Sequence, residues 1–322
     1  MTKKKTRLKF LLKNKTLMKT ICFKLFGKER KQNTYSFDYQ NYLAKYIFNY
    51  KYDCTNPRSF NEYLGWIKFF YRNNLWERCA DKIKAKDFLI ENGFLDYVPA
   101  TLGKYKDVGE IDLDKLPNRF VLKTNHDCGS VFICDKTKTD FDRVFKELSK
   151  SLKHSYSNDN GEWVYENIKP IIFAEELLEP DEGEQLVDYK LFSFNGIVGF
   201  GFVAQDRNSD CRFTLIDRNF GYINSDYIYL RPNKNAYPKR PHDFDLMVEI
   251  AESIGKILNF ARIDFYQTKK GPKIGEITFF SQTGLGPFTN SRYDFIFGDY
   301  FRYTIFPDLI REKRDKLYEN CF

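Results

Sequence analysis

Four polar side chains stand at alternating positions in the segment ARIDFYQTKKGPKIGEITFF, and their types suit a binding site. Arg262 and Asp264 precede the expected turn, and Glu276 and Thr278 follow it. Side chains two apart on a strand lie on the same face of a sheet. If a hairpin turn is centred on Lys270, Asp264 faces Glu276 and Arg262 faces Thr278. The segment therefore predicts four polar groups on one face of a hairpin.

Two carboxylates that face each other across a strand pair repel, so Asp264 and Glu276 need a reason to be opposed. A hard cation supplies one, because Mg²⁺ is held by one or two carboxylates together with phosphate oxygens. Arg262 would neutralise the remaining charge of a polyphosphate, and Thr278 would add a neutral oxygen. The alternative is a surface hairpin in which Arg262 pairs with an acid.

A lysine at the end of an apolar strand is a second candidate. Lys123 ends the run FVLK and is followed by the polar turn HDCGS, which contains Gly129. Backbone N–H groups of such a turn, together with an adjacent ammonium group, can bind phosphate. A lysine that carries its charge from an apolar stem to solvent would give the same pattern.

Two further pairs of polar residues occur in predicted strands. Lys190 shares a face with Asp188 in VDYKLFSF, and either a phosphate contact or a surface position is consistent with that pattern. Glu175 and Glu176 come where the buried strand PIIFAEELL opens into a linker. There they could contact a base and a ribose, or be two solvated acids.

Several function classes are disfavoured by what the sequence lacks. It has neither a GxxxxGK[ST] nor a GxGxxG motif, which argues against P-loop, Rossmann and kinase-type phosphate loops. Seven Cys without a CxxC pair and three His without HExxH argue against zinc sites and a disulfide framework. DxD triplets begin at 112, 140 and 243, and the latter two fall where helices are expected to start, so a structural role explains them.

The elements that must position these residues follow from periodicity. Helices are expected at 34–52, at 59–71 with a Ser59–Glu62 capping box, at 78–91, at 139–153 with Thr139 as cap, at 242–259 and beyond 291. Strands are expected at 120–125, 131–134 and 170–178, and hairpins at 187–206, around Asn195-Gly196, and at 261–280. The fold class is therefore α+β with mostly antiparallel sheets.

Charge is concentrated at the start of the 322-residue chain. Residues 1–31 hold twelve Lys/Arg and one acid, whereas the whole chain is +8, so the body is slightly acidic. Apolar residues interrupt the charges, which favours a basic amphipathic helix on an anionic membrane, although a solvated or protein-docked tail is an alternative. No nucleic-acid partner is expected, because the body offers no basic patch with interleaved aromatics. Without a signal-peptide core, a cytoplasmic location, peripheral at the inner face of the plasma membrane, is expected.

The order of these pieces resembles the TupA-like ATP-grasp proteins of polysaccharide gene clusters. The matching stretches are NPRSFNEYLGWIKFF, ADKIKAKDFL, LPNRFVLKTNHDCGS, IIFAEELLE, DYKLFSFNG and RIDFYQ…KIGEITFFSQTG. The resemblance implies two α+β subdomains whose antiparallel sheets clasp ATP, preceded by a helical region. The implied divisions are 1–31 as a basic arm, 32–100 as a helical N-terminal region, 101–178 as the central subdomain, and 179–322 as the C-terminal subdomain with a helical tail.

The resemblance also implies roles for individual residues. Lys123 resembles the strand lysine on the α- and β-phosphates, and Arg262 the γ-phosphate arginine. Asp264 and Glu276 resemble the Mg²⁺ ligands, and Thr278 stands where many relatives have Asn. The residues expected to contact the nucleotide are His126, Gly129 and Ser130 of a phosphate-covering loop, Glu175, Glu176 and Leu178 of a linker that holds adenine and ribose, and Asp188 and Lys190 of a neighbouring strand.

The function implied is that of an ATP- and Mg²⁺-dependent carboxylate–amine ligase that works through an acylphosphate. Its expected substrates are a uronic acid of a surface polysaccharide, or its precursor, and an amino acid or small amine. A sugar kinase, a glycosyltransferase and a non-catalytic binding module are the alternatives. The amine, the sugar and the oligomeric state do not follow from the sequence.

Overall fold

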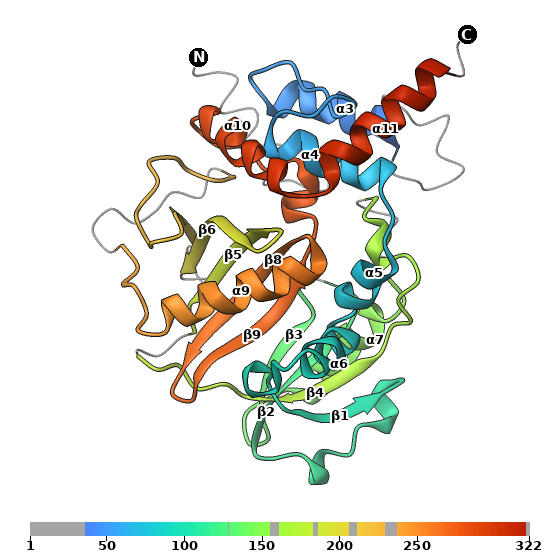
Figure 1. The fold of residues 1–322 in the computed structure, drawn as a ribbon. Helices are drawn as coiled ribbons and strands as arrows, with labels where there is room; N and C mark the ends of the chain where they lie inside the picture. The colour runs from blue at the N-terminus through green and yellow to red at the C-terminus, as the bar shows by residue number, and fades with distance from the viewer. Residues whose placement is uncertain are drawn as a thin grey trace.

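The computed structural model describes residues 36–127, 129–154, 161–182, 186–205, 211–228 and 237–319, with side chains up to residue 313. The basic arm at 1–31 lies outside these residues. Within them, no helix is both long and apolar enough to cross a membrane. Figure 1 shows two antiparallel sheets, with a group of helices from both ends of the chain above the larger sheet.

The N-terminal region is helical, as predicted. Its helices are α3 (Phe37–Ile47), α4 (Phe60–Phe70), α5 (Asn74–Ala80) and α6 (Lys82–Glu91), followed by the short η1 (Leu95–Tyr97). The Ser59–Glu62 capping box that begins α4 is confirmed. The single helix expected at 78–91 is wrong, because Asp81 interrupts it. The Asp81 side chain accepts a hydrogen bond from Ile83 N at 3.0 Å and so caps the start of a new helix, α6.

The smaller sheet, sheet A, has the strand order β1-β4-β2-β3. Its strands are β1 (Thr101–Tyr105), β2 (Arg119–Thr124), β3 (Val131–Asp135) and β4 (Ile172–Glu176), and it is accompanied by η2 (Val108–Glu110), η3 (Leu113–Lys115) and η4 (Trp163–Tyr165). Helix α7 (Phe141–Ser151) covers one face, and its buried Val144 and Leu148 pack with Phe120 and Leu122.

The cap of α7 differs from the prediction. Asp140 begins the helix and accepts a hydrogen bond from Arg143 N at 3.0 Å. Thr139 Oγ1 instead accepts from Asp135 N at 2.8 Å, which closes the turn that precedes the helix. The carboxylate is the stronger acceptor near the positive end of a helix, so Asp140 takes the capping position.

The larger sheet, sheet B, has the order β7-β6-β5-β8-β9. Its strands are β5 (Asp188–Phe194), β6 (Ile197–Gln205), β7 (Arg212–Ile216), β8 (Phe260–Thr268) and β9 (Gly271–Thr278). The β5–β6 hairpin turns at Asn195-Gly196 as predicted, and both residues have positive φ, 49° and 88°. Helix α9 (Phe244–Leu258) packs on one face of this sheet, where a Cβ on Gly255 would clash with Ser193 Oγ.

The β8–β9 hairpin reaches the predicted pairing by a different route. The turn consists of Lys269 and Lys270, between Thr268 and Gly271, and is not centred on Lys270. Phe265 then pairs with Ile274, which alone would put Asp264 opposite Gly275. A β-bulge at Gly275 adds the missing residue and restores the pairing of Asp264 with Glu276.

The C-terminal elements return to the N-terminal helices. They are η5 (Ser281–Gly284), α10 (Arg292–Gly298), η6 (Asp299–Tyr303) and α11 (Phe306–Glu319). Figure 1 shows α10 and α11 beside α3 and α4. Buried Asn61 of α4 donates to Asp294 Oδ2 of α10 at 2.9 Å. The Trp76 indole of α5 donates to Leu258 O at the end of α9, also at 2.9 Å.

Candidate active site

Three strands of sheet B bring polar residues together on the face opposite α9. Lys190 of β5 pairs with Asp264 of β8, and Asp264 pairs with Glu276 of β9. In the next row, Arg262 of β8 pairs with Thr278 of β9. Ser193 faces α9, so Lys190, an odd number of residues away, lies on the other face. The predicted pairings of Asp264 with Glu276 and of Arg262 with Thr278 are confirmed.

Arg262 lies between the two carboxylates. Its Nε donates to Asp264 Oδ1 at 2.6 Å and its Nη2 to Asp264 Oδ2 at 2.8 Å. Nη2 also donates to Glu276 Oε1 and Thr278 Oγ1, both at 3.0 Å. The guanidinium group therefore offsets the expected repulsion between the carboxylates.

The cluster is buried and nearly balanced in charge. Lys190 Nζ binds the Asp264 carboxylate and lies 3.3 Å from Asp188 Oδ2. Asp188 and Asp264 are 0% and 1% exposed. The side chain of Glu276, by contrast, is 29% exposed, so it is the carboxylate that opens toward solvent.

The two carboxylates respond to this environment differently, and burial raises the pKa of Asp264 above its usual range despite the neighbouring Arg262 and Lys190. Burial by itself would raise the pKa of Glu276, but Arg262 and Lys190 outweigh it and hold that pKa well below its usual range. Burial lowers the pKa of Arg262, and the neighbouring Asp264 and Glu276 more than compensate, so the guanidinium stays charged. Glu276 is therefore ionised at neutral pH and able to bind a cation.

A second cluster lies on sheet A, around Glu175. Lys123 of β2 binds the Glu175 carboxylate from the neighbouring strand. Lys86 of α6 binds its other oxygen at 2.6 Å and also donates to Pro99 O at 2.8 Å. Glu175 is buried, and burial would raise its pKa, but the two lysines lower it below the usual range. The lysine predicted for phosphate thus binds a carboxylate of the neighbouring strand.

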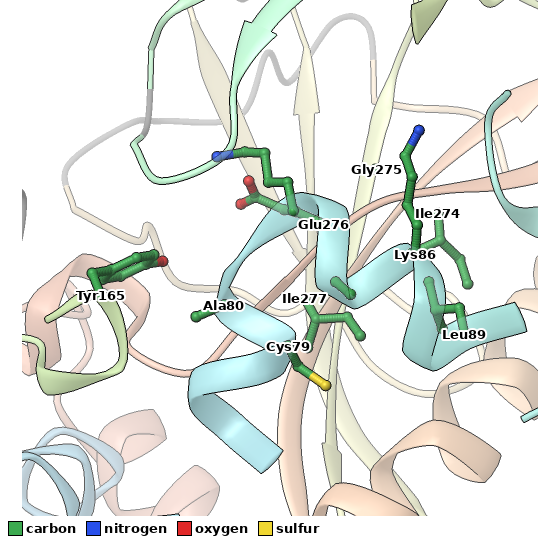
Figure 2. Close-up of a pocket in the computed structure, with 11 residues that line it drawn as sticks. Cys79, Ala80, Lys86, Leu89, Tyr165, Ile274, Gly275, Glu276 and Ile277 are labelled. Atoms are coloured by element: carbon green, nitrogen blue, oxygen red, sulfur yellow. The ribbon is translucent and has the colours of Figure 1, made fainter. Parts of the chain in front are cut away.

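Sequence reasoning missed Lys82 and Lys86, which lie one helical turn apart on α6. Lys82 Nζ donates to Asp127 O in the loop after β2. Both lysines line a cavity between α6 and β9 that Glu276 also lines. Figure 2 shows Lys86 on α6 and Glu276 on β9 around this cavity. Helix α6 therefore places Lys86 in the Glu175 cluster and Lys82 at the cavity that Glu276 also lines. The i, i+4 spacing in KIKAK was the only signal for them.

The loop after β2 is organised by a residue that was not predicted. Asp127 accepts hydrogen bonds from Thr124 Oγ1 and Ser130 Oγ at 2.6 Å and from Ser151 Oγ at 2.5 Å. Gly129 has φ of +121°, a conformation that side chains disfavour. Cys128 lies outside the described residues.

His126 occupies a different environment from its loop neighbours. It is 3% exposed, and its Nε2 lies 3.2 Å from the backbone oxygens of both Ser151 and His154. Because both partners are acceptors, Nε2 carries the proton. This position, against the end of α7, indicates a structural contribution to the loop.

The linker residues complete the set of predicted positions. Glu176 Oε1 accepts from Ala100 N at 2.7 Å, so this side chain is turned toward the segment before β1. Leu178 is half-buried beyond the end of β4.

Another feature that the sequence analysis missed is an apolar surface beside Lys123. Val131 and Ile133 of β3 are 49% and 63% exposed on the Lys123 face of sheet A.

The described residues contain no group of three or more His, Cys, Asp or Glu side chains arranged around a metal position. Asp264 and Glu276 would supply two protein ligands. That number fits Mg²⁺ when phosphate oxygens and water complete its octahedron.

The chain matches the model of the family described as TupA-like ATPgrasp over residues 62–302. Together with two antiparallel sheets and a polar face on each, this match defines the class as an ATP-grasp protein. The chain belongs to the TupA-like ATP-grasp family.

Similar solved structures include three ligases and synthetases. D-alanine–D-alanine ligase from Bacillus anthracis with ATP is 17% identical, with 62% of this chain and 53% of that chain covered and a TM-score of 0.35. The ATP-grasp ligase PsnB with precursor peptide PsnA2 and AMPPNP is 13% identical, with 64% and 50% covered and a TM-score of 0.36. N5-carboxyaminoimidazole ribonucleotide synthetase from Thermus thermophilus is 13% identical, with 63% and 46% covered and a TM-score of 0.35.

The chain thus spans about half the length of these structures. No curated protein matches its sequence. Family membership rests on the family model.

Proposed function

We propose that this protein is an ATP- and Mg²⁺-dependent ligase that joins a carboxylate to an amine. The observation that carries the proposal is the arrangement of Arg262, Asp264 and Glu276 on sheet B. Lys123 of sheet A and Lys86 of α6 form a second basic cluster around Glu175. Membership in an ATP-grasp family supports the same chemistry.

The nucleotide would lie between the two sheets. Lys123 and Lys86 would exchange the Glu175 carboxylate for α- and β-phosphate oxygens, and Lys82 lies between them and Glu276. Gly129 and Ser130 would cover the phosphates. The exposed side chains of Val131 and Ile133 offer an apolar surface for the base, and Glu175, Glu176 and Leu178 would contact adenine and ribose.

Arg262 and Lys190 would act at the γ-phosphoryl group, close to Asp188. Asp264, Glu276 and Thr278 engage Arg262 Nε and Nη2. Nη1, whose hydrogen bond to Ser281 Oγ is long at 3.4 Å, is the nitrogen that would make this contact. Asp264 and Glu276, with Thr278 beside them, would hold Mg²⁺. The metal ion would neutralise charge that develops on the phosphate oxygens.

The reaction would proceed in two displacements. The acceptor carboxylate oxygen attacks the γ-phosphorus, the bond to the bridging oxygen breaks, and ADP leaves with that electron pair. The amine nitrogen then attacks the acyl carbon, phosphate leaves, and the nitrogen loses a proton to give the amide. The protein's contribution is positioning and charge neutralisation by Arg262, Lys190 and Lys123.

The substrate class follows from the sequence resemblance. We propose a uronic acid of a surface polysaccharide or its precursor as the carboxylate, and an amino acid or small amine as the nucleophile. The basic arm at 1–31 would hold the enzyme at the cytoplasmic face of an anionic membrane, where a lipid-linked acceptor is accessible.

The test is to incubate the protein with ATP, Mg²⁺, a panel of uronic acids and a panel of amines, followed by mass spectrometry. A ligase yields ADP, phosphate and an adduct that has lost one water. A phosphorylated sugar without free phosphate would identify a kinase, and a transferred sugar without ATP consumption would identify a glycosyltransferase. Asp264→Asn should abolish the adduct, whereas Asp245→Asn, at an exposed position on α9, should not.

A further inference from the structure

A left-handed turn follows β9 directly. Gln282, Thr283 and Gly284 have φ of 48°, 54° and 71°, three consecutive residues in the left-handed region. Glycine adopts this conformation without cost, but a β-branched residue such as Thr283 is strained there. Backbone strain of this kind persists only where the surrounding structure imposes it, and it concentrates at functional sites.

A buried lysine from the N-terminal region holds this turn. Lys68 of α4 is 1% exposed. Its Nζ donates to Thr283 O at 2.5 Å, to Thr283 Oγ1 at 2.6 Å and to Gln40 Oε1 at 2.9 Å. Buried Glu162 interacts electrostatically with the ammonium group. A Cβ on Gly284 would lie 3.1 Å from Leu64 Cβ, so the turn is also pressed against α4.

Burying a lysine is costly, and an apolar side chain of similar volume often serves packing as well or better. The ammonium group at this position does something that an apolar side chain cannot do. It binds both the backbone and the side-chain oxygen of the strained residue Thr283. These two hydrogen bonds therefore favour the left-handed geometry of the turn.

The turn begins at a residue that contacts the candidate active site. Ser281 Oγ lies 2.9 Å from Tyr227 Oη and accepts from Arg262 Nη1 at 3.4 Å. Among the hydrogen bonds of the described residues, Ser281 is the only partner of Nη1. The position of Ser281 therefore affects the orientation of Arg262 Nη1, the guanidinium nitrogen that makes no hydrogen bond to a carboxylate.

We propose that Lys68 is a positioning residue. By holding the left-handed turn, it keeps Ser281 where it orients Arg262 Nη1 toward the γ-phosphoryl group of bound ATP. This inference rests on the proposed nucleotide site and adds a remote residue to it.

The experiment compares two nucleotides that differ at the γ-position. Isothermal titration calorimetry with Mg²⁺ measures the Kd of AMP-PNP and of ADP for wild type, Lys68→Met and Ser281→Ala. Both variants should bind AMP-PNP about tenfold more weakly, as expected for one weakened charge-assisted hydrogen bond, and ADP within about twofold of wild type. The matched control is Lys313→Met, which removes a lysine that donates to Phe70 O at the end of α4, and it should change neither Kd.

Lys68→Met leaves Glu162 buried without its cation, so Lys68→Met/Glu162→Gln is measured as well, in case the single variant does not fold. The same selective loss of AMP-PNP affinity in the double variant supports the proposal. Equal weakening for both nucleotides, or no weakening, overturns it while leaving the proposed function intact. Failure of the wild type to bind either nucleotide overturns the proposed function and this inference together.

Discussion

Arg262 holds Asp264 through two parallel hydrogen bonds from one guanidinium group, at 2.6 Å and 2.8 Å. This fork geometry is strong and directional. Together with Lys190, Arg262 leaves the site nearly balanced in charge. A metal ion must therefore compete with Arg262 for the carboxylates, whereas a phosphate can bind at Nη1.

Glu276→Gln should have two effects. The free energy of unfolding without ligand should fall by about 0.2–1 kcal/mol, because the contact from Arg262 to an ionised carboxylate is lost. Stabilisation by Mg·ATP, about 2.7 kcal/mol for wild type at a hundredfold excess over Kd, should largely disappear. The repulsion inferred from sequence would instead have made the variant as stable as wild type or slightly more stable. Thermal melts with and without Mg·ATP measure both effects, and Glu249→Gln on the exposed face of α9 is the control. A preserved Mg·ATP response would rule out Glu276 as a metal ligand.

Lys123→Ala should weaken nucleotide binding while the fold survives. Glu175 would keep its contact with Lys86 at 2.6 Å, so the substitution leaves no isolated buried charge. The loss of one charge-assisted phosphate contact corresponds to about 1.5–3 kcal/mol of binding free energy. Calorimetric titration with ATP gives the affinity, and Lys104→Ala on the exposed edge strand β1 is the control. A large drop in Tm with unchanged affinity would mean that Lys123 is structural.

His126→Leu should lower stability and leave nucleotide affinity unchanged. The backbone oxygens of Ser151 and His154 would lose their donor, at a cost of about 1–3 kcal/mol. Burial lowers the pKa of His126 below 6.5, so the contribution of the neutral ring to stability is complete above that pH and is lost as pH falls below it. Denaturant unfolding should be measured from pH 8 downward. The difference in the free energy of unfolding between wild type and variant should become smaller as the pH falls. A lower affinity for ATP with an unchanged free energy of unfolding would show that His126 contacts the nucleotide.

Deleting residues 1–31 should release the protein from vesicles that contain anionic lipid. Binding of the intact chain should weaken with added salt, since charge attraction is screened over about 8 Å at physiological ionic strength. Co-sedimentation with anionic and with neutral vesicles measures this, and turnover of soluble substrates should be unchanged by the deletion. Equal sedimentation before and after the deletion would show that the arm is not the membrane contact.

The strands that carry the candidate site residues were the most predictable part of the fold, whereas β1 and β7 were not predicted. Two-residue alternation is strong in β8 and β9, and Asn195-Gly196 has the backbone preferences of its turn. The break at Asp81 was less visible, because the sequence on both sides of it is helix-forming and only the cap separates α5 from α6. The bulge at Gly275 was not predicted, although it is what aligns Glu276 with Asp264.

The partners of charged side chains were harder to foresee than their positions. Strand periodicity predicted that Arg262 and Glu276 share one face of the sheet. It did not predict that Arg262 would donate hydrogen bonds to both Asp264 and Glu276. Lys86 meets Glu175 only because α6 packs beside sheet A and β9, and such contacts depend on tertiary packing rather than local pattern. Because the sequence KIKAK is typical of any solvent-exposed helix, it did not indicate that either lysine belongs to the site.

The contacts of α4 and α5 have a consequence for the order in which the chain acquires structure. Asn61 binds Asp294 across a separation of 233 residues, and the Trp76 indole reaches Leu258 across 182. A ribosome delivers the N-terminal helices long before these partners exist, and contacts of such long range form slowly. The first helices must therefore wait, with Trp76 exposed, until the C-terminal elements emerge. We expect the isolated segment 101–322 to be poorly soluble, because the surface on which α4 and α5 pack would stay uncovered.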